Sequence, residues 1–219
     1  MKKVTPTIWL LTVLIAAVMP SFSSATTLKE GEYAPGFAYI AATSEGSVTF
    51  TGGEGTWNCT SSSMFGQILK NQENWILLTM TSVSIQGNIG KENLCTGLYQ
   101  TEGKVTVKNV PWCLSSTGAD AWLLRGGGCN EVSRPLVVTI DAKEKEFAPG
   151  YVFPAYSCTY SQYSISGFYN TGVTPVTLSS GSNTFSRTEG SYLFCPSSLT
   201  LDIKYTLSTA GGGGLQITY

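Results

Sequence analysis

The chain has 219 residues, of which 42% are hydrophobic and only 12% are charged, and it contains no histidine. This hydrophobic content argues against a disordered chain, and the length suits one domain. Thirteen basic residues stand against 14 acidic ones. We therefore expect no nucleic-acid partner, because binding to phosphate backbones requires a basic surface.

The first 25 residues have the layout of a secretory signal peptide. Lys2 and Lys3 precede an apolar run over 8–19, and Ser23-Ser24-Ala25 supplies small residues at a cleavage site. The run is shorter than the roughly 20 apolar residues that span a bilayer. We expect cleavage after Ala25 and a single secreted β domain, 26–219, with no transmembrane segment. The signal carries two lysines and no acid, so the mature formal charge is −3.

The mature chain then alternates short strands with turns. Apolar residues at every second position predict strands over 47–51, 79–85, 104–107 and 199–207, whereas 135–140 is typical of a more fully buried strand. Turns are predicted at 51–55, 116–118, 125–128 and 180–183 from their Gly, Ser and Asn residues. Residues 215–219 are expected to form an edge strand rather than the last strand of an outer-membrane barrel, whose closed ladder accommodates cysteines poorly. The pattern favours an all-β fold: an antiparallel, Greek-key-like β-sandwich or flattened barrel.

An even number of cysteines in an exported chain favours disulfides over free thiols. The six are Cys59, Cys95, Cys113, Cys129, Cys158 and Cys195. Two segments, about 48–112 and 136–207, each contain Cys-Thr, a Ser-rich strand, a Gly and a second Cys at nearly equal spacing. If these are related halves, Cys59 pairs with Cys95 and Cys158 with Cys195, which leaves Cys113 and Cys129. Coincidence is the alternative, because Ser, Thr and Gly are common throughout.

Several short motifs then occur in an order that resembles a known family. They are Cys59, Gly66, Thr81-Ser-Val-Ser-Ile85 with Gly87, Leu94-Cys95, Val110-Pro-Trp112, Cys158 and Cys195-Pro-Ser-Ser-Leu199. Together they resemble the exported bacterial proteins called protein activators of alkane oxidation, over roughly 50–207. The chain departs from that pattern at Cys113, at Cys129 and at the charged stretch 141–146. The resemblance implies a secreted accessory protein that helps cells to use alkanes.

Catalytic and metal-binding patterns are absent from the sequence. No histidine is available as a base for a nucleophile, and neither a Ser-x-x-Lys nor a Gly-x-Ser-x-Gly pattern occurs. Without histidine or a Cys-x-x-Cys pair we expect no metal or cofactor. A carboxylate pair suited to glycoside hydrolysis is the remaining enzymatic alternative. Its candidates are Glu54, Asp120, Glu131, Asp141 and Asp202, each more simply interpreted as a solvated surface charge.

The aromatic residues are the better functional candidates. Trp57, Trp75 and Trp112 lie in or beside predicted strands, where aromatic residues favour the core. The tyrosine-rich and serine-rich stretch 151–169 is instead typical of an adaptable exposed surface. We therefore predict an exposed aromatic patch that contains Tyr151, Tyr156, Tyr160, Tyr163 and Tyr169.

The sequence thus favours a secreted, non-enzymatic accessory protein that acts at hydrophobic interfaces or in the extracellular matrix. Its expected partners are an apolar interface, the cell surface or matrix components, and its oligomeric state is left open. A carbohydrate-binding or adhesive surface module is the first alternative. A glycoside hydrolase-like enzyme is the second.

Overall fold

The computed structural model describes residues 27–30, 39–53, 55–72, 75–97, 100–117, 120–170 and 173–218. The predicted signal peptide, 1–25, lies outside the described residues. So do Glu54, Gly118 and Tyr219.

The described residues form 20 β-strands and no helix, which confirms the all-β prediction. The strands are β1 (Thr27–Glu30), β2 (Tyr39–Ser44), β3 (Val48–Gly52), β4 (Gly55–Cys59), β5 (Ser61–Gln72), β6 (Trp75–Gln86), β7 (Cys95–Thr96), β8 (Glu102–Lys108), β9 (Trp112–Ser116), β10 (Ala121–Gly126), β11 (Leu136–Ala142), β12 (Lys145–Ala148), β13 (Tyr151–Phe153), β14 (Tyr156–Gln162), β15 (Ser164–Tyr169), β16 (Thr177–Ser180), β17 (Asn183–Glu189), β18 (Ser198–Asp202), β19 (Lys204–Thr209) and β20 (Leu215–Thr218).

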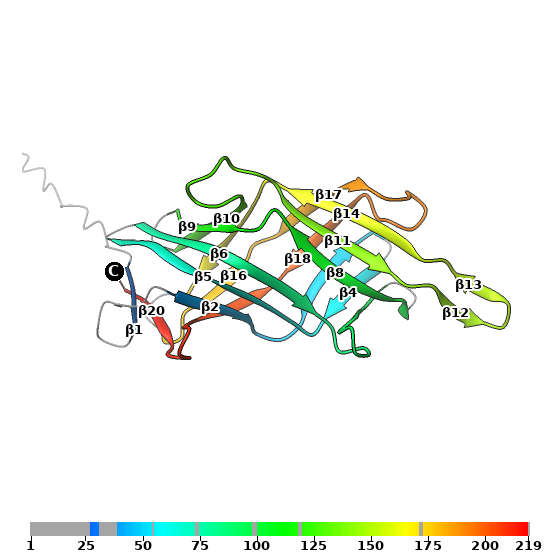
Figure 1. Ribbon diagram of the computed structural model, residues 1–219, viewed down its shortest axis with the longest axis horizontal. Helices are drawn as coiled ribbons and strands as arrows, with labels where there is room; N and C mark the ends of the chain where they lie inside the picture. The colour runs from blue at the N-terminus through cyan, green and yellow to red at the C-terminus, as the bar shows by residue number, and fades with distance from the viewer. Residues whose placement is uncertain are drawn as a thin grey trace, which may run out of the picture.

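Sixteen of these strands form two closed antiparallel rings of eight. The first ring has the order β10-β15-β16-β19-β2-β5-β6-β9, and the second has the order β11-β14-β17-β18-β3-β4-β7-β8. Each passage of the chain along the molecule contributes one strand to each ring, as β2 and β3 do in the first passage and β18 and β19 do in the last. The chain therefore passes back and forth along the molecule through both rings (Figure 1).

The ring order corrects the Greek-key expectation. A Greek key requires a long connection that returns a strand beside an earlier one. Here each passage of the chain pairs with the passage before it and the passage after it, and the first pairs with the last through β2–β19 and β3–β18. The topology is an up-and-down meander that closes on itself.

The core fills the interior of the rings because alternate residues of each strand point inward. Along 199–207, Leu199, Leu201, Ile203, Tyr205 and Leu207 are all buried, which confirms the predicted alternation. Strand β11 is buried over most of its length, also as predicted.

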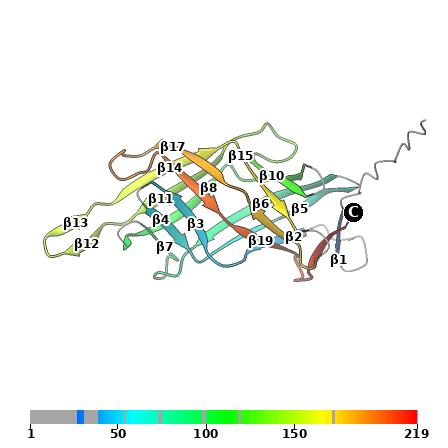
Figure 2. The same ribbon diagram turned by 180° about the vertical axis from the view of Figure 1, so that it is seen from behind.

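A separate two-stranded sheet, β1–β20, lies at one end of the molecule, opposite a projecting β12–β13 hairpin (Figures 1 and 2). Leu28 of β1 and Ile217 of β20 are fully buried there against the first ring. The Asn71 side-chain amide secures β1 by accepting a hydrogen bond from the Leu28 nitrogen (2.8 Å) and donating one to its carbonyl oxygen (2.9 Å). The predicted C-terminal edge strand is thus β20.

All six cysteines are in disulfides, and the pairings predicted from the repeated spacing, Cys59–Cys95 and Cys158–Cys195, are confirmed. Cys59–Cys95 joins β4 to β7, Cys113–Cys129 joins β9 to the loop after β10, and Cys158–Cys195 joins β14 to the loop before β18. Whether the segments 48–112 and 136–207 are repeated halves stays a prediction.

Candidate functional site

The projecting hairpin carries large exposed apolar side chains. It consists of β12 and β13 and turns at Pro149-Gly150, where Gly150 has φ +79°, a conformation that glycine adopts without steric cost. The ladder is irregular between Glu146 and Ala148, so Phe147 occupies a bulge. Its ring lies 6.0 Å from that of Tyr151, at an interplanar angle of 45°.

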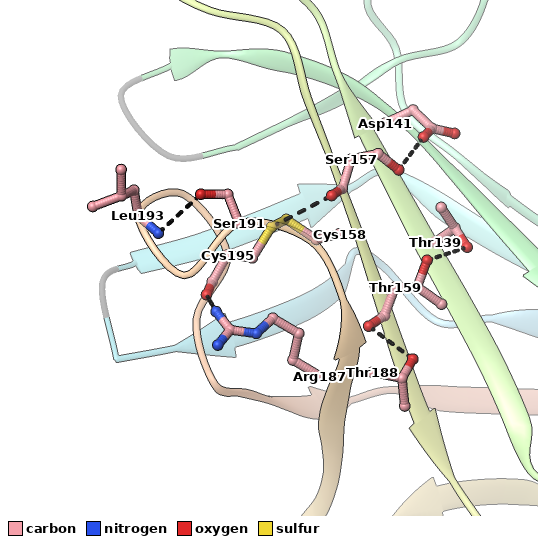
Figure 3. Close-up of a disulfide and its surroundings, with 10 residues drawn as sticks. All are labelled: Thr139, Asp141, Ser157, Cys158, Thr159, Arg187, Thr188, Ser191, Leu193 and Cys195. Carbon is pink, nitrogen blue, oxygen red and sulfur yellow. Dashed lines mark hydrogen bonds between the residues drawn. A yellow bond between two sulfur atoms is a disulfide. The ribbon is translucent and has the colours of Figure 1, made fainter.

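A second apolar element is the loop 190–197 between β17 and β18. Cys195 is bonded to Cys158 of β14, and its backbone nitrogen donates to the Ser191 carbonyl oxygen at 2.9 Å. The Arg187 guanidinium donates to the Cys195 carbonyl oxygen, and Leu193 points away from the disulfide (Figure 3). The loop is therefore held at both ends while its tip faces solvent.

Gly190 is required at the start of this loop. Its φ of +111° lies in the region that other residues rarely adopt, and an added Cβ would be 2.6 Å from the Ser157 carbonyl oxygen and 2.7 Å from the Cys195 Sγ atom. The close approach of the loop to β14 depends on this missing side chain.

A cluster of aromatic rings joins the hairpin to the loop. The Phe194 ring is stacked on Tyr156 at a centroid distance of 5.6 Å and meets Phe153 of the hairpin edge-on at 5.4 Å. Tyr156 in turn contacts the buried Trp57 at 6.5 Å. Partial burial raises the pKa of the Tyr156 hydroxyl, so this ring is neutral at ordinary pH.

The exposed apolar side chains of these two elements lie toward the same end of the molecule, and we call this set the distal patch; Tyr151 and Val152 are successive residues of β13, so they face opposite sides of the hairpin. Its side chains have exposed fractions between 51% and 75%. The members are Phe147, Tyr151, Val152, Tyr192 and Leu193. Large apolar side chains that gather at one end of a molecule are a common sign of an interaction surface.

The predicted tyrosine patch is only partly correct. Tyr151 and Tyr163 are exposed and Tyr156 is half-buried, but Tyr160 and Tyr169 are wrong, with exposed fractions of 1% and 6%. The cause is strand alternation, which turns Tyr160 on β14 and Tyr169 on β15 toward the core. Tyr163 follows β14 at the end remote from Tyr156, so it belongs to no patch with Tyr151.

The tryptophan prediction also needs one correction. Trp57 and Trp112 are buried as expected, as is Trp122, whereas Trp75 at the start of β6 is 46% exposed. The Lys70 ammonium lies 3.8 Å from the centroid of the Trp75 ring, a cation–π contact between β5 and β6.

Four members of the distal patch were missed by the sequence interpretation: Phe147, Val152, Tyr192 and Leu193. The charged stretch 141–146, which departs from the family pattern, runs from the end of β11 into β12, the first strand of the hairpin. The useful signal was the run Phe147-Ala-Pro-Gly-Tyr-Val-Phe153, in which apolar residues flank a turn.

The candidate carboxylates lie on different elements. Asp141 is on β11, where it accepts a hydrogen bond of 2.6 Å from the Ser157 hydroxyl, and Asp202 ends β18, with β14 and β17 between those strands in the ring. Asp120 precedes β10, and Glu131 lies in the loop after it.

The described part of the chain has no group of three or more Cys, Asp or Glu residues placed to hold a metal ion. The void in the core measures about 20 Å³, which is room for about one water molecule. This void is therefore too small for a ligand of ordinary size.

Comparison with known protein families, with curated proteins and with solved structures finds no match. Within the described residues, no helix is long and apolar enough to cross a membrane.

Proposed function

We propose that this protein is exported, has no catalytic activity and adsorbs to apolar interfaces outside the cell through the distal patch. In this role it helps cells to reach water-insoluble carbon sources such as alkanes. The observation that carries the proposal is the gathering of five exposed apolar side chains on a hairpin and a disulfide-tied loop. The three disulfides suit an oxidising location outside the cytoplasm.

The energy available to such a surface is sufficient for adsorption. An aromatic side chain buries about 150–250 Å², so a ring that is two-thirds exposed offers roughly 130 Å². At about 25 cal/mol per Å², each such ring contributes about 3 kcal/mol when it enters an apolar phase. The Cys158–Cys195 disulfide and the aromatic cluster keep the patch assembled, so the fold need not open to present it.

The test is drop-shape tensiometry at a hexadecane–water interface. The mature protein should lower the tension, and the Phe147→Ser/Tyr151→Ser variant should adsorb much less because it loses up to about 6 kcal/mol of transfer free energy. Tyr163→Ser is the matched control, since this tyrosine is at least as exposed but lies outside the patch. Equal tension curves for the wild type and the double variant would refute the proposal.

A carbohydrate-binding or adhesive module is the second candidate, and one observation favours it. Tyr39 on β2 and Phe65 on β5 are exposed, with ring planes 12° apart and centroids 5.9 Å apart. Nearly parallel exposed rings suit stacking on sugars. Glycan binding that is lost in Tyr39→Ala, together with no effect at hexadecane, would support this function in place of the first.

A further inference from the structure

The wall of the molecule contains a gap between β6 and β8. Strand β6 pairs with β9 only over Leu77–Met80, and β8 meets β7 only at Gly103 and Glu102. Between these two junctions, residues 81–86 pair with β5 alone and residues 104–108 pair with β11 alone. Both segments are described in full, and no ladder joins them. Each therefore presents to the other a strand edge that no ladder covers, although the Lys108 carbonyl oxygen accepts a hydrogen bond from the Trp112 indole nitrogen at 3.2 Å.

The sequence between β8 and β9 explains why the ladder stops. Asn109 has φ +60°, and its side-chain amide donates to the Pro135 carbonyl oxygen at 2.8 Å, which directs the chain toward β11. Pro111 has no N–H group to offer to β6. A regular ladder that started from the Met80–Trp112 pair is thus interrupted at once, and no strand pairing continues from it between β6 and β8.

The gap forms a cavity whose floor and outer rim are lined by different kinds of side chain. It measures about 310 Å³, within the lower range of ligand sites. Its floor consists of Val83, Ile85, Val105 and Val107, and Ile85 also borders the void in the core. Apolar side chains placed into the gap would therefore meet apolar partners.

The outer rim is basic. Lys104 and Lys108 of β8 are exposed and point outward, four residues apart. The facing edge of β6 carries the neutral Ser82, Ser84 and Gln86. Glu92, the acidic residue among those that line the gap, is bound to Lys143 at 2.6 Å and also interacts electrostatically with Lys104. An occupant with carboxylates on its outward face would complement this rim.

We propose that the gap binds an extended segment of a partner polypeptide in which apolar and acidic residues alternate. The segment runs antiparallel to β8 and pairs with its free edge. Its apolar side chains enter the gap above Ile85, and its acidic side chains lie opposite Lys104 and Lys108. Strand addition of this kind supplies main-chain hydrogen bonds for affinity, while alternate side chains give specificity.

The test uses fluorescein-labelled Val-Glu-Val-Glu-Val-Glu, with Val-Lys-Val-Lys-Val-Lys as the charge control. In anisotropy titrations the Glu peptide should bind saturably and at least tenfold more tightly than the Lys peptide. Methylation of alternate peptide nitrogens should abolish binding, because it removes the donors needed by the strand edge. Equal binding of the Glu and Lys peptides, or undiminished binding of the methylated peptide, would overturn the proposal.

Two variants locate the site. Lys108→Glu should reduce the preference for the Glu peptide at least threefold, whereas Lys70→Glu, about 20 Å along the β5–β6 ladder, should leave it unchanged. Hydrogen exchange should slow at 81–86 and 104–108 when the peptide is bound. Protection confined to other strands, or an equal effect of the two substitutions, would contradict the assignment. The Phe147→Ser/Tyr151→Ser variant should bind the peptide normally, so this test and the test of the distal patch succeed or fail independently.

Discussion

The packing of Trp57 against two glycines allows a sharp test of how the core supports the distal patch. The Trp57 ring is almost fully buried and lies over Gly97 and Gly103. A Cβ added at Gly103 would be 2.6 Å from the ring and 3.1 Å from the Asp141 carbonyl oxygen. Neither neighbour can retreat easily, because Asp141 belongs to the β8–β11 ladder and Trp57 contacts Tyr156 behind it.

We therefore expect Gly103→Ala to lower the free energy of unfolding by about 1–3 kcal/mol, the usual cost of overpacking. Gly53→Ala is the matched control, because nothing lies within 4 Å of its added Cβ. It should change the free energy of unfolding by less than about 0.5 kcal/mol. Urea denaturation monitored by far-ultraviolet circular dichroism gives both values.

A double-mutant cycle then identifies the clash. Trp57→Phe removes the second ring of the indole, so adding Gly103→Ala to it should cost less than adding Gly103→Ala to the wild type. If Gly103→Ala unfolds at the same urea concentration as Gly53→Ala, or if the two substitutions are additive, the ring does not rest on Gly103 as described.

Two further predictions concern stability. Replacing both Cys158 and Cys195 by Ala should lower the free energy of unfolding by about 4 kcal/mol, and replacing both Cys113 and Cys129 should lower it by about 3 kcal/mol. The second loss is smaller because that disulfide spans 16 residues rather than 37. Denaturant titrations that gave the reverse order would contradict this explanation. Burial raises the pKa of Tyr205 to about 12 from 10.0, so the unfolded chain ionises first and the free energy of unfolding should fall between about pH 10 and pH 12, by up to roughly 3 kcal/mol. Urea midpoints of Tyr205→Phe should lack most of this fall; the same pH dependence in both proteins would exclude Tyr205 as its source.

Local patterns in the sequence were enough to predict the class of fold and two of its disulfides. Alternation over 199–207 depends only on the period of a strand, so it identifies which residues face the core without knowledge of the neighbouring strands. The repeated Cys-Thr spacing predicted Cys59–Cys95 and Cys158–Cys195, and the structure confirms both. The lack of histidine likewise excludes, from the sequence alone, the catalytic arrangements that use a histidine base.

Only the tertiary structure decided which strands are neighbours and therefore which exposed side chains share a surface. Closure of the meander through β2–β19 depends on contacts between residues far apart in the chain, which no local period encodes. Tyr151 and Tyr160 look alike in the sequence, but one lies on a hairpin beyond the ring and the other faces its interior. The contact between Phe153 and Phe194 joins two segments about 40 residues apart, and the gap at β8 exists because a pairing is missing. Both features arise from long-range packing, since local preference determines the strand while register and burial determine its partners.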